Sequence, residues 1–414
     1  MAITNKEQGV WKLNEVYNKI NEGGIWSYTA DPMGGIWSWG AGGSGALGLN
    51  HLLQVSSPTQ VGTYSGWNFL AKNDSDNYAA VGAIKKDGTL WTWGNNDNGA
   101  LGQNNQTERS SPAQVGTDTT WNYNIVVGGP WGTMRALKTD GTAWVWGANQ
   151  HGSLGINQPV DYRRSSPVAL PGTTWKNFFR NGAVKTDGTL WTWGSNTYGQ
   201  LGLNTSRQNP SNLNKKSSPT QVGTNTTWAI AEAGNSGQSF AVKTDGSLWS
   251  WGRNQYGILG HNNQGSPTDR SSPVRVGTDT TWGSQSNQLS ASSHVCTAVK
   301  TDGTLWAWGY NQKGQLGQNE GPGTDNSGAY SSPVQVGTDT NWNSVSSTYW
   351  GTLGSKTDGT LWSWGINNDG SLGLNQANGA GLSSPTQIPG AWIDPTNEYA
   401  LTTQNNRRWA IRGT

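Results

Sequence analysis

One short phrase occurs seven times along this chain of 414 residues, and it restricts the possible folds more than any other feature. A typical copy, residues 187–202, reads Asp-Gly, then Trp-x-Trp-Gly, then Asn-x-x-Gly-x-Leu-Gly; the first copy departs from it and begins Met33-Gly34-Gly35. The glycines that close Trp-x-Trp-Gly are Gly40, Gly94, Gly147, Gly194, Gly252, Gly309 and Gly365. They are 47 to 58 residues apart, a spacing that predicts a ring or array of small units, each packing on the next.

The Asp-Gly pairs predict β-hairpins, because a two-residue type I′ turn needs positive φ at both central residues. In the fourth copy, folding the chain about Asp187-Gly188 pairs Val184 with Trp191. Side chains alternate across a strand, so Val184 is expected on the face of the two tryptophans, with Ala183 and Lys185 on the opposite face.

The residue between the two tryptophans is always small or short-branched: Ser38, Thr92, Val145, Thr192, Ser250, Ala307 and Ser363. One face of each sheet is therefore expected to be bulky and the other low, so that the Trp face of one unit seats on the low face of its neighbour. A Ser-Ser-Pro segment after each phrase predicts an outer strand, since Pro is tolerated at sheet edges. A further Trp then opens another strand, which gives four strands per unit, as in a propeller blade.

The order Trp, Ala-Val-Lys-x-Asp-Gly-x-Leu-Trp-x-Trp-Gly, Asn-x-x-Gly-x-Leu-Gly and Pro-x-x-Val resembles the repeat of the regulator of chromosome condensation family over residues 25–411. The resemblance implies an all-β fold, a seven-bladed β-propeller of four-stranded antiparallel blades. Residues 399–411 look like a worn further hairpin, so eight blades is the less favoured count. We expect the two chain ends to meet in or beside one blade.

Residues 25–414 are assigned to the propeller and residues 1–24 to an N-terminal segment. Helical spacing predicts a short amphipathic helix over residues 11–22, ended by Gly23-Gly24. Part of this segment resembles a short element of marine phage structural proteins. We interpret the helix either as an attachment element or as a plug or clasp of the ring; its candidate attachment residues are Trp11, Leu13, Val16, Tyr17 and Ile20.

Composition restricts the partners. Only 13% of residues are charged and the formal charge is +2, which gives no electrostatic case for nucleic acid or an anionic membrane. No apolar run approaches the length of a membrane span, and the start has no pattern of a secretion signal. The four histidines and the single Cys296 show no metal-ligand or nucleophile pattern, so we expect no catalytic site, metal or cofactor. The recurrent Asn of the phrase is assigned to turn chemistry and tolerance of left-handed backbone.

Variable loops on a rigid ring are the expected place for recognition. The candidates are aromatic or basic residues of the segments that follow Trp-x-Trp-Gly, which can anchor a partner, although they are equally compatible with solvated loops. They are Tyr162, Arg163, Arg164, Tyr198, Arg207, Tyr256, Tyr310 and Lys313.

The favoured function is a non-enzymatic structural or binding protein of a virus particle, a tailed phage, acting in decoration, in the tail or in host recognition. Such a protein is assembled in the host cytoplasm without a secretion signal, yet works outside in the virion. Its expected partners are other virion proteins or a host surface protein or glycan; the oligomeric state is open. The alternative is a soluble propeller of inhibitor or scaffold type. Small-GTPase exchange, which the resemblance implies, and a propeller enzyme are less favoured.

Overall fold

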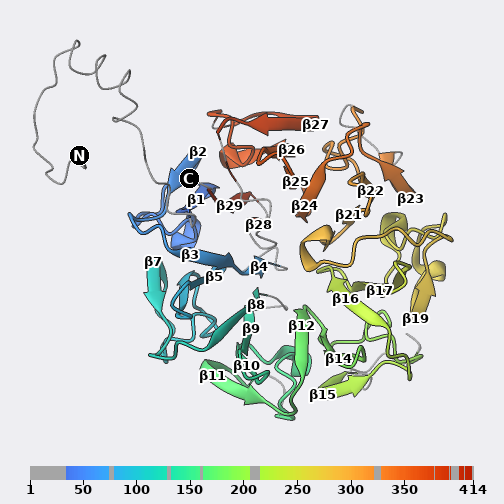
Figure 1. Cartoon of the computed structure of the whole chain (residues 1–414), viewed down its shortest axis with the longest axis horizontal. Helices are drawn as coiled ribbons and strands as arrows, with labels where there is room; N and C mark the ends of the chain where they lie inside the picture. Colours follow the sequence, from blue (N-terminus) through green and yellow to red (C-terminus); the bar gives the residue numbers. More distant parts are fainter. Residues whose placement is uncertain are drawn as a thin grey trace, which may run out of the picture.

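The computed structural model describes residues 34–73, 79–127, 132–158, 162–205, 215–320, 328–376, 378–390, 392, 401–404 and 406–412. In these ranges the chain forms seven β-sheets arranged as blades around a central axis (Figure 1). The predicted seven-bladed, all-β propeller is therefore confirmed. The predicted helix over residues 11–22 and its candidate attachment residues lie outside the described residues.

Each blade has four antiparallel strands, here given from the axis outward. The first three blades are β28 (Leu401–Gln404), β29 (Arg407–Ile411), β1 (Ile36–Gly40) and β2 (Val55–Gln60); β3 (Trp67–Leu70), β5 (Ala80–Lys85), β6 (Leu90–Gly94) and β7 (Arg109–Gln114); and β8 (Trp121–Val127), β9 (Thr133–Lys138), β10 (Ala143–Gly147) and β11 (Arg164–Leu170). β4 (Lys72–Asn73) joins the third blade as a parallel fifth strand beside β8.

The other four blades are formed without interruption along the chain. They are β12 (Trp175–Phe179), β13 (Gly182–Lys185), β14 (Leu190–Gly194) and β15 (Lys216–Gln221); β16 (Trp228–Ala233), β17 (Gln238–Lys243), β18 (Leu248–Gly252) and β19 (Arg270–Arg275); β20 (Leu289–Ala291), β21 (Val295–Val299), β22 (Leu305–Gly309) and β23 (Tyr330–Gln335); and β24 (Trp342–Ser347), β25 (Gly351–Lys356), β26 (Leu361–Asn367) and β27 (Gly379–Ile388).

Both ends of the chain build the first blade. β1 pairs with β2 on one side and with β29 on the other, so the outer half comes from the beginning of the propeller and the inner half from its end. The segment that resembles a worn hairpin in the sequence is this inner half. Our expectation that the ends meet in one blade is confirmed.

The predicted hairpin register was wrong by one residue. Val184 pairs with Leu190 and Ala183 with Trp191, because the turn contains three residues rather than two. The side chain of Asp187 accepts hydrogen bonds from the backbone N–H and the hydroxyl of Thr189, at 2.9 and 2.6 Å. Gly188 is left-handed at φ +76°, which matches a type I turn followed by a bulge.

The corrected register puts Ala183 and Lys185, not Val184, on the face of the tryptophans. Lys185 Nζ consequently lies 4.5 Å from the ring centroid of Trp191. The same stacking recurs in six blades at 3.6–4.5 Å, by Lys85, Lys138, Lys185, Lys243, Lys300 and Lys356. A cation over an indole contributes about 0.5–2 kcal/mol, so the repeated Lys is part of the blade and not a free surface charge.

The predicted nesting of neighbouring blades is confirmed. Trp193 of the fourth blade packs with Val145 on the low face of the third blade, while Val184 and Leu190 pack with Trp251 of the fifth. The second Trp of every Trp-x-Trp-Gly is at most 1% exposed. The core is thus a series of layers between blades.

Two hydrogen bonds join each blade to the next around the whole ring. The buried indole N–H donates to a carbonyl of the preceding blade at 2.7–3.1 Å, in the pairs Trp39–Ser371, Trp93–Ala46, Trp146–Ala100, Trp193–Ser153, Trp251–Gln200, Trp308–Ile258 and Trp364–Gln315. The Asn of each Leu-Gly-x-Asn segment donates its backbone N–H to a carbonyl of the following blade, that of the first Ser in its Ser-Ser-Pro, at 2.7–3.0 Å. Buried donors are thereby satisfied at every joint.

Candidate binding face

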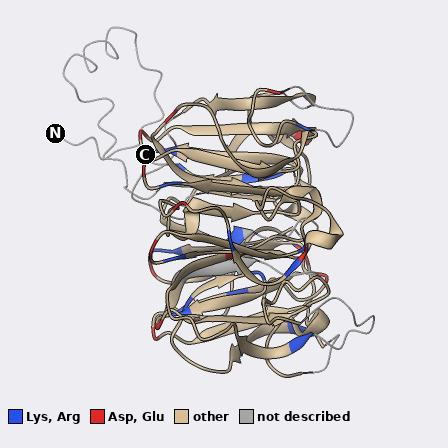
Figure 2. Ribbon diagram, turned by 90° about the vertical axis from the view of Figure 1, so that its right-hand side faces the viewer, with Lys and Arg blue, Asp and Glu red and all other residues tan. Residues whose placement is uncertain are grey.

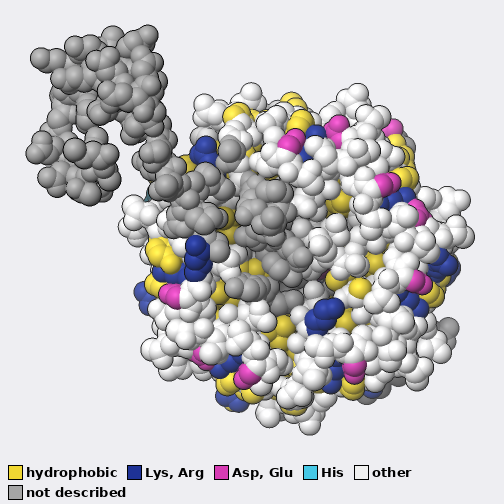
Figure 3. Space-filling view, viewed as in Figure 1, with side chains coloured by type: hydrophobic (Ala, Val, Ile, Leu, Met, Phe, Trp, Pro, Cys, Tyr) yellow, Lys and Arg dark blue, Asp and Glu magenta, His cyan; other side chains and the backbone are white. Residues whose placement is uncertain are grey.

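The variable loops of the ring lie on one face. Because the four strands of a blade alternate in direction, the turn between its first and second strands lies at the same edge as the loop that follows Trp-x-Trp-Gly. We call this side the loop face. The Asp-Gly turns lie at the opposite edge. Acidic and basic residues are scattered along the ring rather than gathered in one area (Figures 2 and 3).

A recurrent Asn gives the loops after Trp-x-Trp-Gly a common backbone. The Asn254 side chain accepts a hydrogen bond from the backbone N–H of Leu259 at 2.9 Å, and five other blades repeat this bond at 2.9–3.1 Å. This agrees with the turn role that the sequence predicted. The left-handed part of that prediction was wrong at Asn254, whose φ is −111°; positive φ falls instead on Tyr256, at +58°. Residues between these fixed points can vary without changing the loop.

A pocket of about 340 Å³ opens on the loop face between the third, fourth and fifth blades. Its lining is polar and aromatic: Gln150, His151, Ser153, Arg180, Asn181, Trp193, Gly194, Ser195, Thr197, Tyr198, Gln200, Gly234, Asn235, Ser236, Gly237 and Arg253. This size suits a small molecule or one unit of a larger ligand.

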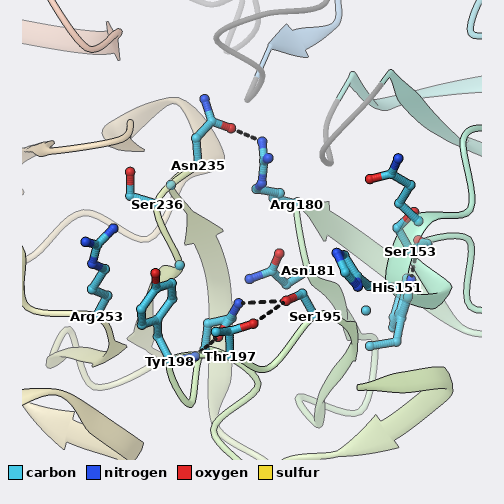
Figure 4. A pocket seen from close by; sticks show the side chains of 16 residues that line it. His151, Ser153, Arg180, Asn181, Ser195, Thr197, Tyr198, Asn235, Ser236 and Arg253 are labelled. Carbon is cyan, nitrogen blue, oxygen red and sulfur yellow. Dashed lines mark hydrogen bonds between the residues drawn. The ribbon is translucent and has the colours of Figure 1, made fainter. Parts of the chain in front are cut away.

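Two arginines enter the pocket from adjacent blades (Figure 4). Arg180, in the turn between β12 and β13, is 8% exposed and donates to the side-chain oxygen of Asn235 in the fifth blade. Arg253 follows β18 directly, and its guanidinium lies 4.7 Å from the ring centroid of Tyr198. Both guanidinium groups are thus oriented by neighbours, which lowers the entropy lost when they bind a ligand.

The charge of the pocket has one sign. The basic residues of its described lining are Arg180, Arg253 and His151, and this lining contains no Asp or Glu. Amide and hydroxyl groups form the rest of the polar surface; for example, the Ser195 and Thr197 hydroxyls lie 3.2 Å apart. The pocket therefore favours an anionic group that also forms several neutral hydrogen bonds.

An aromatic cluster lies on the loop face over the fifth to seventh blades. Tyr256 packs 4.6 Å from Tyr310 and 4.9 Å from His294, and Tyr349 packs 4.8 Å from His294 and 4.0 Å from Trp350, as ring-centroid distances. Tyr256, Tyr349 and Trp350 are half-buried, while His294 and Tyr310 are buried. Tyr256 has φ +58°, and the equivalent loop residues Ser44, His151 and Asp369 share this conformation, so it belongs to the loop backbone common to these blades.

The sequence-predicted binding residues fall into three places. Tyr198 lines the pocket, and Tyr256 and Tyr310 belong to the aromatic cluster, where Tyr310 is only 6% exposed. The other described candidates are half-buried or exposed: Lys313 in a loop of the sixth blade, Tyr162 and Arg163 in the loop after β10, and Arg164 at the start of β11. Arg207 lies outside the described residues.

Sequence reasoning missed Arg180, Arg253, His294, Tyr349 and Trp350. Arg253 carried a usable signal, because it occupies the variable position directly after Trp-x-Trp-Gly. The other four lie in turns between the first and second strands, whose lengths differ from blade to blade. Counted back from the phrase, however, His294 and Trp350 occupy one fixed place, 15 residues before the closing glycine of their blades. Their carbonyls accept the backbone N–H of Tyr310 and Ile366, so this spacing was a signal that could have found them.

The buried His294 and the half-buried His261 are expected to make stability depend on pH. Burial, and secondarily Arg253, lower the pKa of His294 to about 4, and burial lowers that of His261 to about 4. An unfolded His has a pKa near 6.5, so the unfolded chain binds protons first and stability falls as pH drops from about 6.5 to 4. Replacing His294 with Gln should reduce this loss by about 2–3 kcal/mol at pH 4, measured by denaturant unfolding at pH 7.5 and 4.

Carboxylates do not confuse that test. Hydrogen bonds, chiefly from Lys138, hold the pKa of Asp118 at about 2, and that of Asp279 is also about 2. Their contribution begins to fall near pH 5, but the fall is the same in the parent protein and in the His294 variant, so it cancels from the difference between them. The double variant of His261 and His294 should reduce the loss further, and an unchanged pH profile would contradict the assignment.

The described ranges contain neither a metal-binding cluster nor a membrane-spanning helix. No three His, Cys, Asp or Glu side chains among them lie close enough together to hold a metal ion. No helix in the same ranges combines the length and the apolar character that a membrane crossing needs.

The geometry defines the class of protein. It is a Trp-rich seven-bladed propeller whose blades have the same strand order and whose loop-face side chains differ from blade to blade. The sequence profile of the regulator of chromosome condensation (RCC1) repeat matches residues 87–126, 187–237, 245–296 and 302–353. These ranges are thus RCC1 repeats, and the predicted resemblance to that repeat is confirmed.

Curated relatives are similar at moderate identity. The ultraviolet-B receptor UVR8 of Arabidopsis thaliana is 26% identical over 68% of this chain and 62% of its own length. The human E3 ubiquitin-protein ligase HERC2 is 26% identical over 71% of this chain but 6% of its own length. The chain therefore spans less than two thirds of these relatives.

Solved structures share the fold. Prp20p of Saccharomyces cerevisiae superposes with a TM-score of 0.73 at 19% identity, covering 92% of each chain. Human WBSCR16 gives a TM-score of 0.73 at 17% identity, covering 92% of this chain and 99% of its own.

Proposed function

We propose that this protein is a non-enzymatic binding propeller, that it is a component of a phage particle, and that its loop face recognises a host surface. The observation that carries the binding role is the loop face itself. There, identical backbone positions in successive blades hold different side chains, and those of the fourth and fifth blades converge on a pocket lined by two arginines and a tyrosine. A rigid ring with variable loops is an economical design for recognition.

The virion setting is supported by composition and by the N-terminal segment. The chain has 13% charged residues, one Cys and three Met, so it offers few groups for oxidation outside a cell. Residues 9–17 resemble an element of phage structural proteins. Two of its relatives, a receptor and a ligase, fit a propeller that serves as a binding module in different settings.

We expect the full chain to be present in purified particles in a fixed ratio to the major capsid protein. Quantitative mass spectrometry of density-purified particles measures this ratio, and immunogold labelling locates the chain on the particle. Antibody fragments raised against the loop face should block adsorption to host cells, whereas fragments against the N-terminal segment serve as the matched control. A chain abundant in infected cells but absent from particles would rule the virion role out.

A further inference from the structure

We propose that the pocket between the third, fourth and fifth blades binds a sugar unit that carries a carboxylate, such as a uronic acid or sialic acid residue of a glycan. This inference rests on the proposed function, because it specifies the chemistry that the loop face would recognise on a host surface. It is argued from charge, hydrogen-bonding groups, shape and the repeat itself.

The two arginines account for the carboxylate. Arg180 and Arg253 come from different blades, and both line the cavity. A guanidinium forms paired hydrogen bonds with a carboxylate, and the described lining holds no acidic group to compete for it. Asn235 orients Arg180, and Tyr198 lies beneath Arg253.

The neutral polar groups account for a sugar rather than a simple anion. Asn181 and Asn235 supply amides, and Ser195, Thr197 and Ser236 supply hydroxyls around the same cavity. Such groups both donate and accept, as the hydroxyls of a sugar do. An acidic peptide side chain or a phosphate ion would leave most of them without a role.

Shape and aromatic surface agree with a ring-sized ligand. A volume of about 340 Å³ lies at the lower end for small-molecule sites, which suits one monosaccharide with its substituents. The half-buried ring of Tyr198 offers a flat apolar surface for the C–H face of a pyranose. Beyond Arg253, the half-buried rings of Tyr256, Tyr349 and Trp350 provide similar surfaces along which further sugar units can lie.

The repeat shows that Arg253 is not required by the fold. The same position after Trp-x-Trp-Gly holds Ala41, Asn95, Ala148, Ser195, Tyr310 and Ile366 in the other blades. All these blades keep the same strand order. The arginine is therefore free to serve a ligand, and it can be replaced by the Ser of the fourth blade without a change of backbone.

The experiment uses the full chain and isothermal titration calorimetry with glucuronic acid and N-acetylneuraminic acid. Glucose and inorganic phosphate test the sugar and the charge separately. We expect at least one sugar acid to bind at least tenfold more tightly than both. R253S should weaken this binding at least tenfold, whereas R109S, which removes an exposed arginine of β7, should leave it unchanged.

Each other outcome overturns the inference. If glucose bound as tightly as the sugar acids, the arginines would not contribute to binding. If phosphate bound as tightly as the sugar acids, the pocket would be a simple anion site. Failure of both sugar acids to bind, or full binding by R253S, would exclude the proposed ligand class. None of these results changes the presence of the chain in particles, so the proposed function is tested separately.

Discussion

Replacing Gly99 with alanine is expected to lower the free energy of unfolding by about 2–5 kcal/mol. Gly99 has φ +76°, and a Cβ placed on it would lie 2.6 Å from Cα and 2.8 Å from Cβ of Ser165 in the next blade. The left-handed backbone costs an L-residue about 1–2 kcal/mol, and forced overpacking adds about 1–3 kcal/mol. Denaturant unfolding followed by Trp fluorescence measures the change.

Gly116 provides the matched control in the same blade. It also has positive φ, at +59°, but a Cβ on it would meet no atom within 4 Å. Gly116→Ala should therefore cost only the backbone strain, about 1–2 kcal/mol. If both variants lose the same stability, the close approach of Gly99 to the next blade has no energetic weight.

Replacing Lys72 with methionine is expected to destabilise the protein by about 3–5 kcal/mol, because it leaves a buried carboxylate without its partner. Lys72 Nζ pairs with Glu232 of the fifth blade and donates to the carbonyls of Ser286, at 2.8 Å, and Leu289, at 2.7 Å. Glu232 is only 3% exposed. These contacts tie the inner turn of the second blade to the fifth and sixth blades, across the centre of the ring.

The double variant K72M/E232M separates charge from packing. It removes both charges and retains side chains of similar size, so it should recover at least half of the stability lost in K72M. Unfolding free energies of the single and double variants complete the cycle. A loss below about 1 kcal/mol in K72M, or a double variant no better than the single, would show that Glu232 is not an uncompensated charge.

Much of the fold followed from the repeated phrase. The residue between the two tryptophans predicted a low face, and Val145 against Trp193 confirms the nesting of blades. The hairpin register did not follow, because Asp187 binds Thr189 and thereby adds a residue to the turn. One residue in a turn moves every following side chain to the other face of a strand, so an Asp-Gly pair alone does not fix a register.

The binding face was less predictable. Tyr198 and Tyr256 could be chosen because they occupy variable positions in a repeated loop. Arg180 could not, because the short turn between β12 and β13 breaks the spacing that places His294 and Trp350 15 residues before the closing glycine. The pocket forms where the variable loops of three consecutive blades meet. A repeat reveals the spacing of its units more readily than the contacts of their variable loops.

The blade shared by both ends has a consequence during synthesis. β1 begins at Ile36 and β29 ends at Ile411, so the ribosome must add more than 300 residues before the two strands can pair. At about 5–20 residues per second this takes on the order of 20–80 s. Throughout that interval the growing chain is an open arc whose terminal blades expose unpaired strand edges and indoles. Its most hazardous period for aggregation is therefore translation itself, before the last strand leaves the ribosome.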